Sequence, residues 1–222
     1  MLTIAASLRA AALLASIAAG AAPAMPIHAT TIAIWAPSAI SDALVAETVA
    51  EADAIWREAG IEFDWRVVGR RGYDVFATPL SQMPRVVIVA DPGRAGSVNP
   101  ADRNTALGWI AFADGRPDSQ IVLSLGNAEA FMLDSRNVVG RVTEMTRIEH
   151  DRLLGRMMGR ALAHELAHYF LETKGHTKTG LLQASHTARE FFGIDRSRFL
   201  LSPEQRDLAG ARVRRTALVA TR

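Results

Sequence analysis

Three histidines and two glutamates lie within the stretch ALAHELAHYFLETKGH, residues 161–176. His164 and His168 are four residues apart, so on an α-helix their imidazoles leave the same face, one above the other by ~6 Å. Both rings can then bind one metal ion at the ~2.0–2.1 Å that zinc requires. Glu165 is rotated by ~100° from His164, which directs its carboxylate toward a water bound to such an ion rather than toward the ion. The stretch therefore predicts a zinc site with Glu165 as a general base.

The composition restricts what else can build such a site. The chain of 222 residues contains no cysteine, which excludes disulfides, thiolate ligands and a thiol nucleophile. Metal ligands must therefore come from His, Asp or Glu. The basic residues are spread along the chain and the formal net charge is only +2. This pattern is typical of a solvated arginine-rich surface and does not predict a nucleic-acid partner.

The first residues, 1–29, are typical of a secretory signal peptide. One positive charge precedes a run of Ala, Leu and Ile, and small residues suit cleavage near residue 24 or 29. The apolar run, residues 10–24, is shorter than the ~20 residues of a membrane-spanning helix. We therefore expect a secreted or periplasmic protein without stable membrane insertion after cleavage, consisting of a single domain over residues 30–222.

The elements that must position the site follow from hydrophobic periodicity and from turn residues. The sequence predicts strands at residues 30–37, 61–68, 85–92, 106–112 and 120–125, the last two forming a hairpin. It predicts helices at residues 39–59, 147–173 and 203–215. This order indicates an α+β fold, in which a mixed twisted sheet packs on the long helix that carries the site, with a further helix at the C-terminus.

The sequence also predicts the surroundings of individual side chains near the site. Thr146 and Glu149 match the capping box at the start of the long helix. Tyr169 is expected to pack in the interior, whereas Arg160 and Glu172 are expected to be solvated. Arg160 shares the histidine face of the helix, so that it could instead meet an anionic group. The helix at residues 39–59 is expected to bury one face, which consists of Leu44, Val45, Thr48, Ala52, Ile55 and Trp56. The glutamates of this helix, Glu51 included, are expected to lie off that face.

The segment HELAHYFLETKGHTKTGLLQA, residues 164–184, resembles the active site of zincin metallopeptidases, specifically the metzincin type. In that family a third histidine follows the helix, and a downstream turn carrying methionine lies beneath the metal. The resemblance implies a zincin-like fold in which His176 is the third zinc ligand. Gly175 is expected to free the backbone so that His176 can turn back toward the other two ligands. The resemblance covers residues 150–184, and over residues 30–125 it extends only to the order of elements.

The sequence departs from the family pattern H-E-x-x-H-x-x-G-x-x-H at two places. His176 follows His168 by eight residues, with Leu171 at the position of the family's glycine. Leu182 stands where the methionine is expected, and leucine can fill the same hydrophobic floor. Two other residues remain candidates for the third ligand. Glu190 lies 22 residues after His168, a separation seen where a second helix supplies a glutamate, and His186 lies in the same region.

These features together predict an exported zinc endopeptidase with a peptide or protein substrate. Zinc would activate a water that attacks the peptide carbonyl while Glu165 accepts its proton. The resemblance implies that substrate lies along an edge strand, for which Gly108, Trp109 and Ile110 are the candidates, although a Trp in a strand also suits the core. Two other functions remain open: a non-catalytic zinc-binding or interaction module, and a zinc hydrolase of another amide such as a cell-wall peptide cross-link.

Overall fold

The computed structural model describes residues 27–68, 84–90 and 106–220. The predicted signal peptide lies outside these residues except at its last positions. Strand β1 (Ile27–Trp35) begins at Ile27, so cleavage near residue 24 would leave the strand whole, whereas cleavage after residue 29 would remove its start. Among the helices that the structure describes, none combines the length and the apolar character needed to cross a membrane.

Five strands form one sheet in the order β2-β1-β3-β5-β4. The remaining strands are β2 (Ile61–Val68), β3 (Arg85–Val89), β4 (Gly108–Ala113) and β5 (Arg116–Ser124). All neighbours pair in parallel except β4, which pairs antiparallel with β5 through the predicted hairpin. The mixed sheet is therefore confirmed, and β4 forms one of its edges.

The hairpin turn explains why β4 reverses direction. Asp114 and Gly115 both have positive φ values, 50° and 77°, which is the backbone of a two-residue type I′ turn. Asp and Gly adopt this conformation at low cost, and the turn's twist matches that of the flanking strands. The sequence signal Asp-Gly thus fixes the strand that borders the site.

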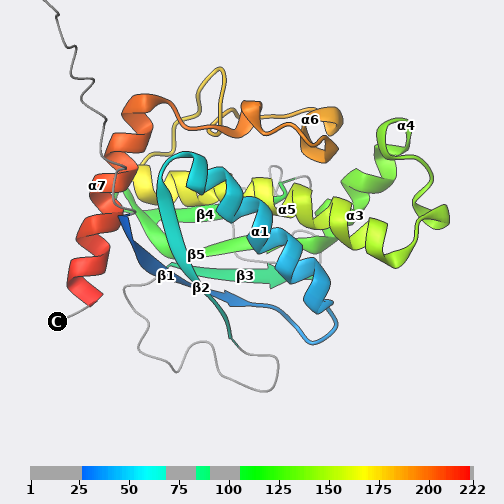
Figure 1. Cartoon of the computed structure of the whole chain (residues 1–222), viewed down its shortest axis with the longest axis horizontal. Coiled ribbons are helices and arrows are strands. Elements are labelled where there is room, and N and C mark those ends of the chain that lie inside the picture. Colours follow the sequence, from blue (N-terminus) through cyan, green and yellow to red (C-terminus); the bar gives the residue numbers. More distant parts are fainter. Residues whose placement is uncertain (1–26, 69–83, 91–105, 221–222) are drawn as a thin grey trace, which may run out of the picture.

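The helices were predicted in part. Helix α1 (Asp42–Glu58) and helix α5 (Arg147–Leu171) lie across one face of the sheet, and α7 (Pro203–Ala220) packs against its end (Figure 1). Helices α3 (Leu125–Asp134), α4 (Arg136–Val139) and α6 (Ala188–Phe192) and the short 3₁₀ turns Val142–Glu144 and Ser197–Phe199 were not predicted.

Helix α3 was missed because it directly continues an apolar strand. The apolar run of β5 hides the change of period, and Gly126 in the first turn weakens the helical signal. The structure starts the helix with a cap, in which the Ser124 hydroxyl accepts a hydrogen bond from the Asn127 N–H at 3.1 Å. That cap, rather than propensity, ends the strand and begins the helix.

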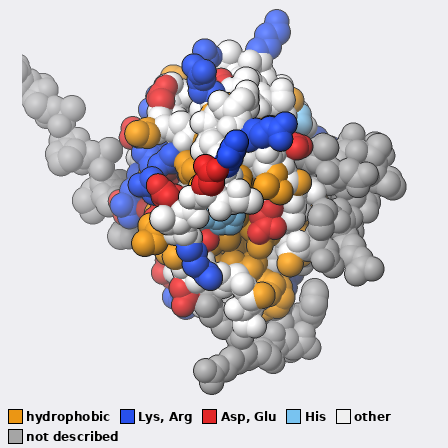
Figure 2. Space-filling view, turned by 90° about the vertical axis from the view of Figure 1, so that its right-hand side faces the viewer, with side chains coloured by type: hydrophobic (Ala, Val, Ile, Leu, Met, Phe, Trp, Pro, Cys, Tyr) orange, Lys and Arg blue, Asp and Glu red, His pale blue; other side chains and the backbone are white. Residues whose placement is uncertain are grey.

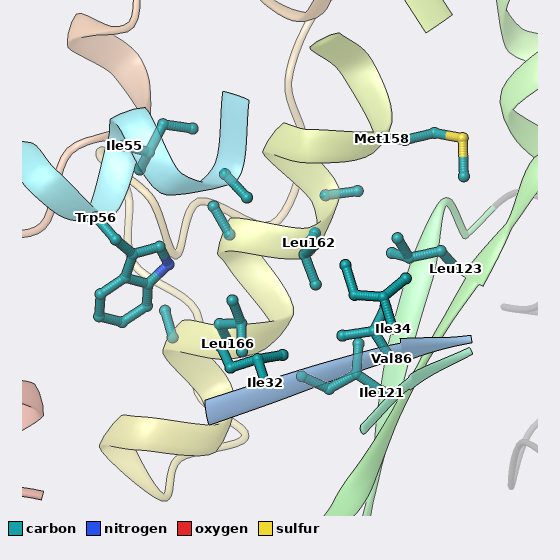
Figure 3. Packing of buried hydrophobic residues seen from close by; sticks show 14 of the residues in the cluster. Ile32, Ile34, Ile55, Trp56, Val86, Ile121, Leu123, Met158, Leu162 and Leu166 are labelled. Carbon is teal, nitrogen blue, oxygen red and sulfur yellow. The ribbon is translucent and has the colours of Figure 1, made fainter. Parts of the chain in front are cut away.

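Helix α5 begins with the predicted capping box, in which the Thr146 hydroxyl and the Glu149 carboxylate each accept a backbone N–H. Its apolar face is buried as expected. Leu162 and Leu166 point toward the sheet, while Ile55 and Trp56 of α1 lie on the other side of the helix (Figure 3). Helix α5 is thus buried along most of its length and forms a rigid base for the residues it carries.

Two glycines of α5 let α1 approach closely. A Cβ at Gly155 would lie 2.5 Å from Glu47 Cβ, and one at Gly159 would lie 2.6 Å from the Thr48 carbonyl oxygen. Any larger residue at either position would push the helices apart. Close packing at this crossing brings α1 within reach of the side chains just before the histidine pair.

Ile61, Phe63, Trp65 and Val67 alternate with charged residues along β2, but burial follows this alternation only at the start of the strand. Ile61 and Phe63 are buried, whereas Val67 is 53% exposed. Strand β2 lies at the sheet edge opposite β4, and Trp56 of α1 packs against Phe63 near its start. The sequence pattern of a strand indicates which side chains are apolar, but it does not predict how much of the strand a helix covers.

Candidate metal centre

His164, His168 and His176 converge in the structure. One ligand atom from each ring lies within 4.8 Å of the other two. His164 is half-buried, His168 is buried and His176 is exposed. The three imidazoles therefore form a group that can hold a metal ion, and it comprises the three residues that the sequence and the family resemblance indicated.

Backbone carbonyls fix the orientation of the two helical rings. His164 Nδ1 lies 2.7 Å from the Leu181 carbonyl oxygen, and His168 Nδ1 lies 2.7 Å from the Thr173 carbonyl oxygen. A carbonyl only accepts, so each Nδ1 must carry the proton and donate it. Each Nε2 is then unprotonated, which is the state in which a histidine nitrogen binds a metal.

The two Nε2 atoms face one another across 3.0 Å. Because both are acceptors in this tautomer, their lone pairs repel unless a cation lies between them. In a tetrahedral site with bonds of ~2.0–2.1 Å, two ligand nitrogens are about 3.3 Å apart. The donor set and its spacing therefore fit a metal ion.

Burial favours the neutral form of both rings. It lowers the pKa of His164 to about 3, with further lowering by the neighbouring His168 and His176. Burial likewise lowers the pKa of His168. Neutral imidazoles hold no proton that a metal must displace, so these two ligands are ready to bind throughout the neutral pH range.

The turn that returns His176 to the site was predicted wrongly. Helix α5 ends at Leu171, and Glu172 adopts the left-handed conformation with φ 49° and ψ 40°. Gly175, the residue expected to reverse the chain, has no positive φ. Glu172 is exposed, as expected, and it also pairs with Arg212 of α7. Non-glycine residues rarely adopt this left-handed conformation.

Residues 177–182 follow His176 in the chain and fix the position of its loop. The Thr177 N–H donates to the Leu182 carbonyl at 2.9 Å, and Leu182 itself is buried in the core. The segment after His176 is thus tied to the hydrophobic core through Leu182. Its neighbour Leu181 supplies the carbonyl that orients His164.

Glu165 lies beside the triad in an apolar environment. It is 8% exposed, and burial raises the pKa of its carboxyl to about 8. The edge strand approaches it closely, since a Cβ on Gly108 would lie 3.1 Å from Glu165 Cγ. A positive charge at the triad would favour the ionised carboxylate and oppose this shift.

A cleft of about 860 Å³ runs between β4 and α5. The triad and Glu165 line it together with Gly108, Trp109 and Ile110, the predicted substrate contacts. Trp109 is only half-buried, so its position is a cleft wall rather than the interior of the core. Histidine and hydrophobic side chains adjoin one another on one face of the molecule (Figure 2).

The other two candidates for the third ligand lie outside the triad. Glu190 caps the short helix α6, where its carboxylate accepts the Thr187 N–H at 2.8 Å. His186 lines the same cleft but does not belong to the group of converging ligand atoms. Tyr169 is buried, as expected for a packing residue.

Arg160 was expected to be solvated, but its side chain is fully buried. Its Nε donates to Glu51 at 2.8 Å, and its two terminal nitrogens donate to the carbonyls of Glu190 and Gly193. Glu51, expected off the buried face of α1, also accepts from Arg196 at 2.7 Å. The side-chain pattern of each helix alone predicts water around both residues, and only the close crossing of α1 and α5 pairs them.

We expect Arg160→Met to destabilise the fold by about 3–5 kcal/mol, because it removes one partner of a buried ion pair and leaves two carbonyls without a donor. Urea denaturation of both proteins measures this difference. Arg152→Met provides the control, since Arg152 lies on the same helix and is exposed. A loss below about 1 kcal/mol would contradict the central role of this network.

Comparisons of the chain with protein-family models, with curated proteins and with solved structures found no match.

Proposed function

We propose that this protein is a zinc-dependent peptidase. The observation that carries the proposal is the convergence of His164, His168 and His176 beside a buried Glu165. Three histidine ligands leave a fourth position for water, which is typical of catalytic rather than structural zinc. A glutamate that does not bind the metal is of no use to a structural site, but a hydrolase needs it.

The ligand chemistry favours zinc over harder cations. Neutral imidazoles suit zinc, copper and nickel, whereas magnesium and calcium prefer oxygen ligands. The chain supplies three imidazoles and no ligating thiolate. Three imidazole ligands that leave one coordination position open for water are one of the ligand sets of catalytic zinc sites. We therefore propose that the metal is zinc.

A zinc ion bound by the triad would lower the pKa of a bound water and polarise a substrate carbonyl. Glu165 accepts the proton of the attacking water and then delivers it to the leaving amine. The apolar environment of Glu165 suits both the acceptance and the delivery of the proton, because a carboxyl with a raised pKa holds a proton well enough to transfer it. The Leu181 and Thr173 carbonyls keep His164 and His168 in the tautomer that the reaction requires.

The edge strand supports a peptide as the substrate. Within the described residues β4 pairs only with β5, so its outer edge offers backbone N–H and C=O groups to an extended chain. Gly108 brings this edge close to Glu165. A peptide added as a further strand would be held mainly by main-chain hydrogen bonds and would pass the triad. We further propose export, on the basis of the signal-like sequence of residues 1–29.

The decisive experiment is metal analysis of the purified protein combined with hydrolysis of a mixed peptide library. We expect about one zinc per chain, cleavage that a chelator abolishes, and recovery when zinc is added back. A magnesium salt added instead serves as the control and should restore nothing. A protein that retains zinc but cleaves no peptide in the library would support a non-catalytic zinc module, and a protein without zinc affinity would contradict both functions.

A further inference from the structure

Four rings that contact one another in succession form a continuous wall of the cleft. Phe131 lies edge-on to Phe191 with ring centroids 5.6 Å apart. Phe191 contacts His186 at 5.6 Å, and His186 stacks on Phe199 at 4.2 Å. All four line the cleft that contains the triad. We call this set, Phe131, Phe191, His186 and Phe199, the aromatic wall.

His186 is the unusual member of the aromatic wall. Its side chain is only 4% exposed, and neither ring nitrogen has a hydrogen-bond partner. Buried polar atoms almost always have a partner, and an imidazole without one loses the hydrogen bonds that water would give it. Its location on the cleft suggests that the missing partner belongs to a molecule that enters the cleft.

The charges around His186 limit what that partner can be. Burial lowers the pKa of His186, so the neutral ring offers one donor and one acceptor. Glu190 lies 3.9 Å from Nδ1 and would repel an anionic group. Arg198 pairs with that carboxylate from the other side at 3.8 Å, and Arg160 stacks on Phe199 at 4.7 Å, so a cationic group would be repelled as well. These charges already pair with one another, Arg198 with Glu190 and Arg160 with Glu51, so a neutral partner that can hydrogen-bond fits beside His186 without separating them.

We propose that the aromatic wall binds the side chain of a tyrosine in the substrate, with the phenol ring against Phe131 and Phe191 and the hydroxyl bonded to His186. A phenol matches both properties of the wall, because its ring packs against aromatic rings and its hydroxyl both donates and accepts. The exposed part of the His186 side chain is carbon, since both nitrogens are buried. In this arrangement the imidazole would turn by a half-turn about the Cβ–Cγ bond, which exchanges the positions of its nitrogen and carbon atoms, so that a nitrogen meets the hydroxyl.

The buried Arg160 holds this wall in place independently of any metal. Arg160 donates to the carbonyls of Glu190 and Gly193, which flank Phe191. Arg156 donates to the Phe192 carbonyl at 2.7 Å. Two arginines of α5 thus fix the backbone of α6 one turn or more before the histidine pair. The binding surface is therefore formed before metal or substrate arrives, which lowers the entropy cost of binding.

The inference rests on the proposed function for the identity of the ligand as a peptide, and the test separates the two by measuring binding without hydrolysis. The metal-free full chain is titrated with p-cresol, the tyrosine side chain without its backbone, and with toluene, which lacks only the hydroxyl. Histidine ring resonances are followed by NMR, and the His186 signal is assigned by its loss in His186→Phe. We expect p-cresol to shift that signal and to bind about tenfold more tightly than toluene, the effect of one net hydrogen bond.

Two variants keep the result interpretable. His186→Phe should lose the preference for p-cresol while binding toluene as the wild type does. His186→Gln, whose amide still donates and accepts, should retain part of the preference. Equal binding of both probes to the wild type, or no shift of the His186 signal, would overturn the inference.

A pair of peptides that differ only in Tyr or Phe connects the wall to hydrolysis. If peptides are cleaved without preference for Tyr, the inference fails while the proposed function stands. If p-cresol is preferred but no peptide is cleaved, the wall is a phenol-binding surface and the proposed function fails.

Discussion

Glu165→Gln is expected to reduce kcat/KM for peptide hydrolysis by about 10²–10⁴-fold while leaving zinc bound. The amide has nearly the shape of the carboxylate but cannot accept the proton of the attacking water. His164, His168 and His176 are unchanged, so the metal stays in place. Hydrolysis rates on a peptide that the wild type cleaves, together with zinc content of both proteins, measure the effect.

The control for this substitution is Glu129→Gln. Glu129 is exposed on α3 and does not line the cleft, so we expect no change in rate. A loss of stability should not account for a change in rate, because burial already disfavours the charged form of Glu165 and glutamine has no charge to bury. The Tm of the metal-free variant is therefore expected to equal or exceed that of the wild type. Equal rates for wild type and Glu165→Gln would remove Glu165 from the reaction.

His176→Ala is expected to weaken zinc affinity by more than about 100-fold. Loss of a residue that only supports a ligand costs about 10–100-fold, and loss of a ligand itself costs more. The two remaining imidazoles hold the ion from one helix face only. Competition with a chromogenic chelator measures the affinity of both proteins. The substitution should change the Tm of the metal-free protein little, since His176 is exposed.

Two further alanine variants test whether the loss of zinc affinity is specific to His176. His150→Ala removes a histidine of α5 that lies outside the triad and should leave affinity unchanged. His186→Ala tests the alternative third ligand, and we expect it to retain zinc. If His186→Ala lost zinc and His176→Ala kept it, the geometry of the triad would be wrong and the ligand set would have to be reassigned.

The sequence predicts most directly the part of the candidate site that lies within one helix. His164, Glu165 and His168 lie within one helix, and helix geometry alone fixes how they are arranged. The capping box at Thr146 is also local and exists in the structure, and Ser202 and Gln205 form a similar box at the start of α7. The prediction that His176 joins the pair came from a family resemblance, and the structure places it there for a different reason than the one expected.

The errors concern places where the backbone or a side chain departs from its local preference. Gly175 was expected to reverse the chain because glycine is permissive, but the left-handed residue after the helix is Glu172. Arg160 and Glu51 are typical surface residues by type, and they are buried because they neutralise one another across a helix crossing. For Arg160 and Glu51 a distant partner outweighed a local preference, and a sequence pattern does not name that partner.

The sequence by itself determined the candidate ligand pair, the general-base candidate, the hairpin and the long helix, because short-range geometry and residue chemistry suffice for these. Only the tertiary structure decided that β4 is an edge strand beside Glu165, that Leu181 and Thr173 orient the two imidazoles, and that His186 lies unpaired in the same cleft. These relations depend on how the chain packs over long separations. Packing depends on the sum of many small contacts rather than on any single motif.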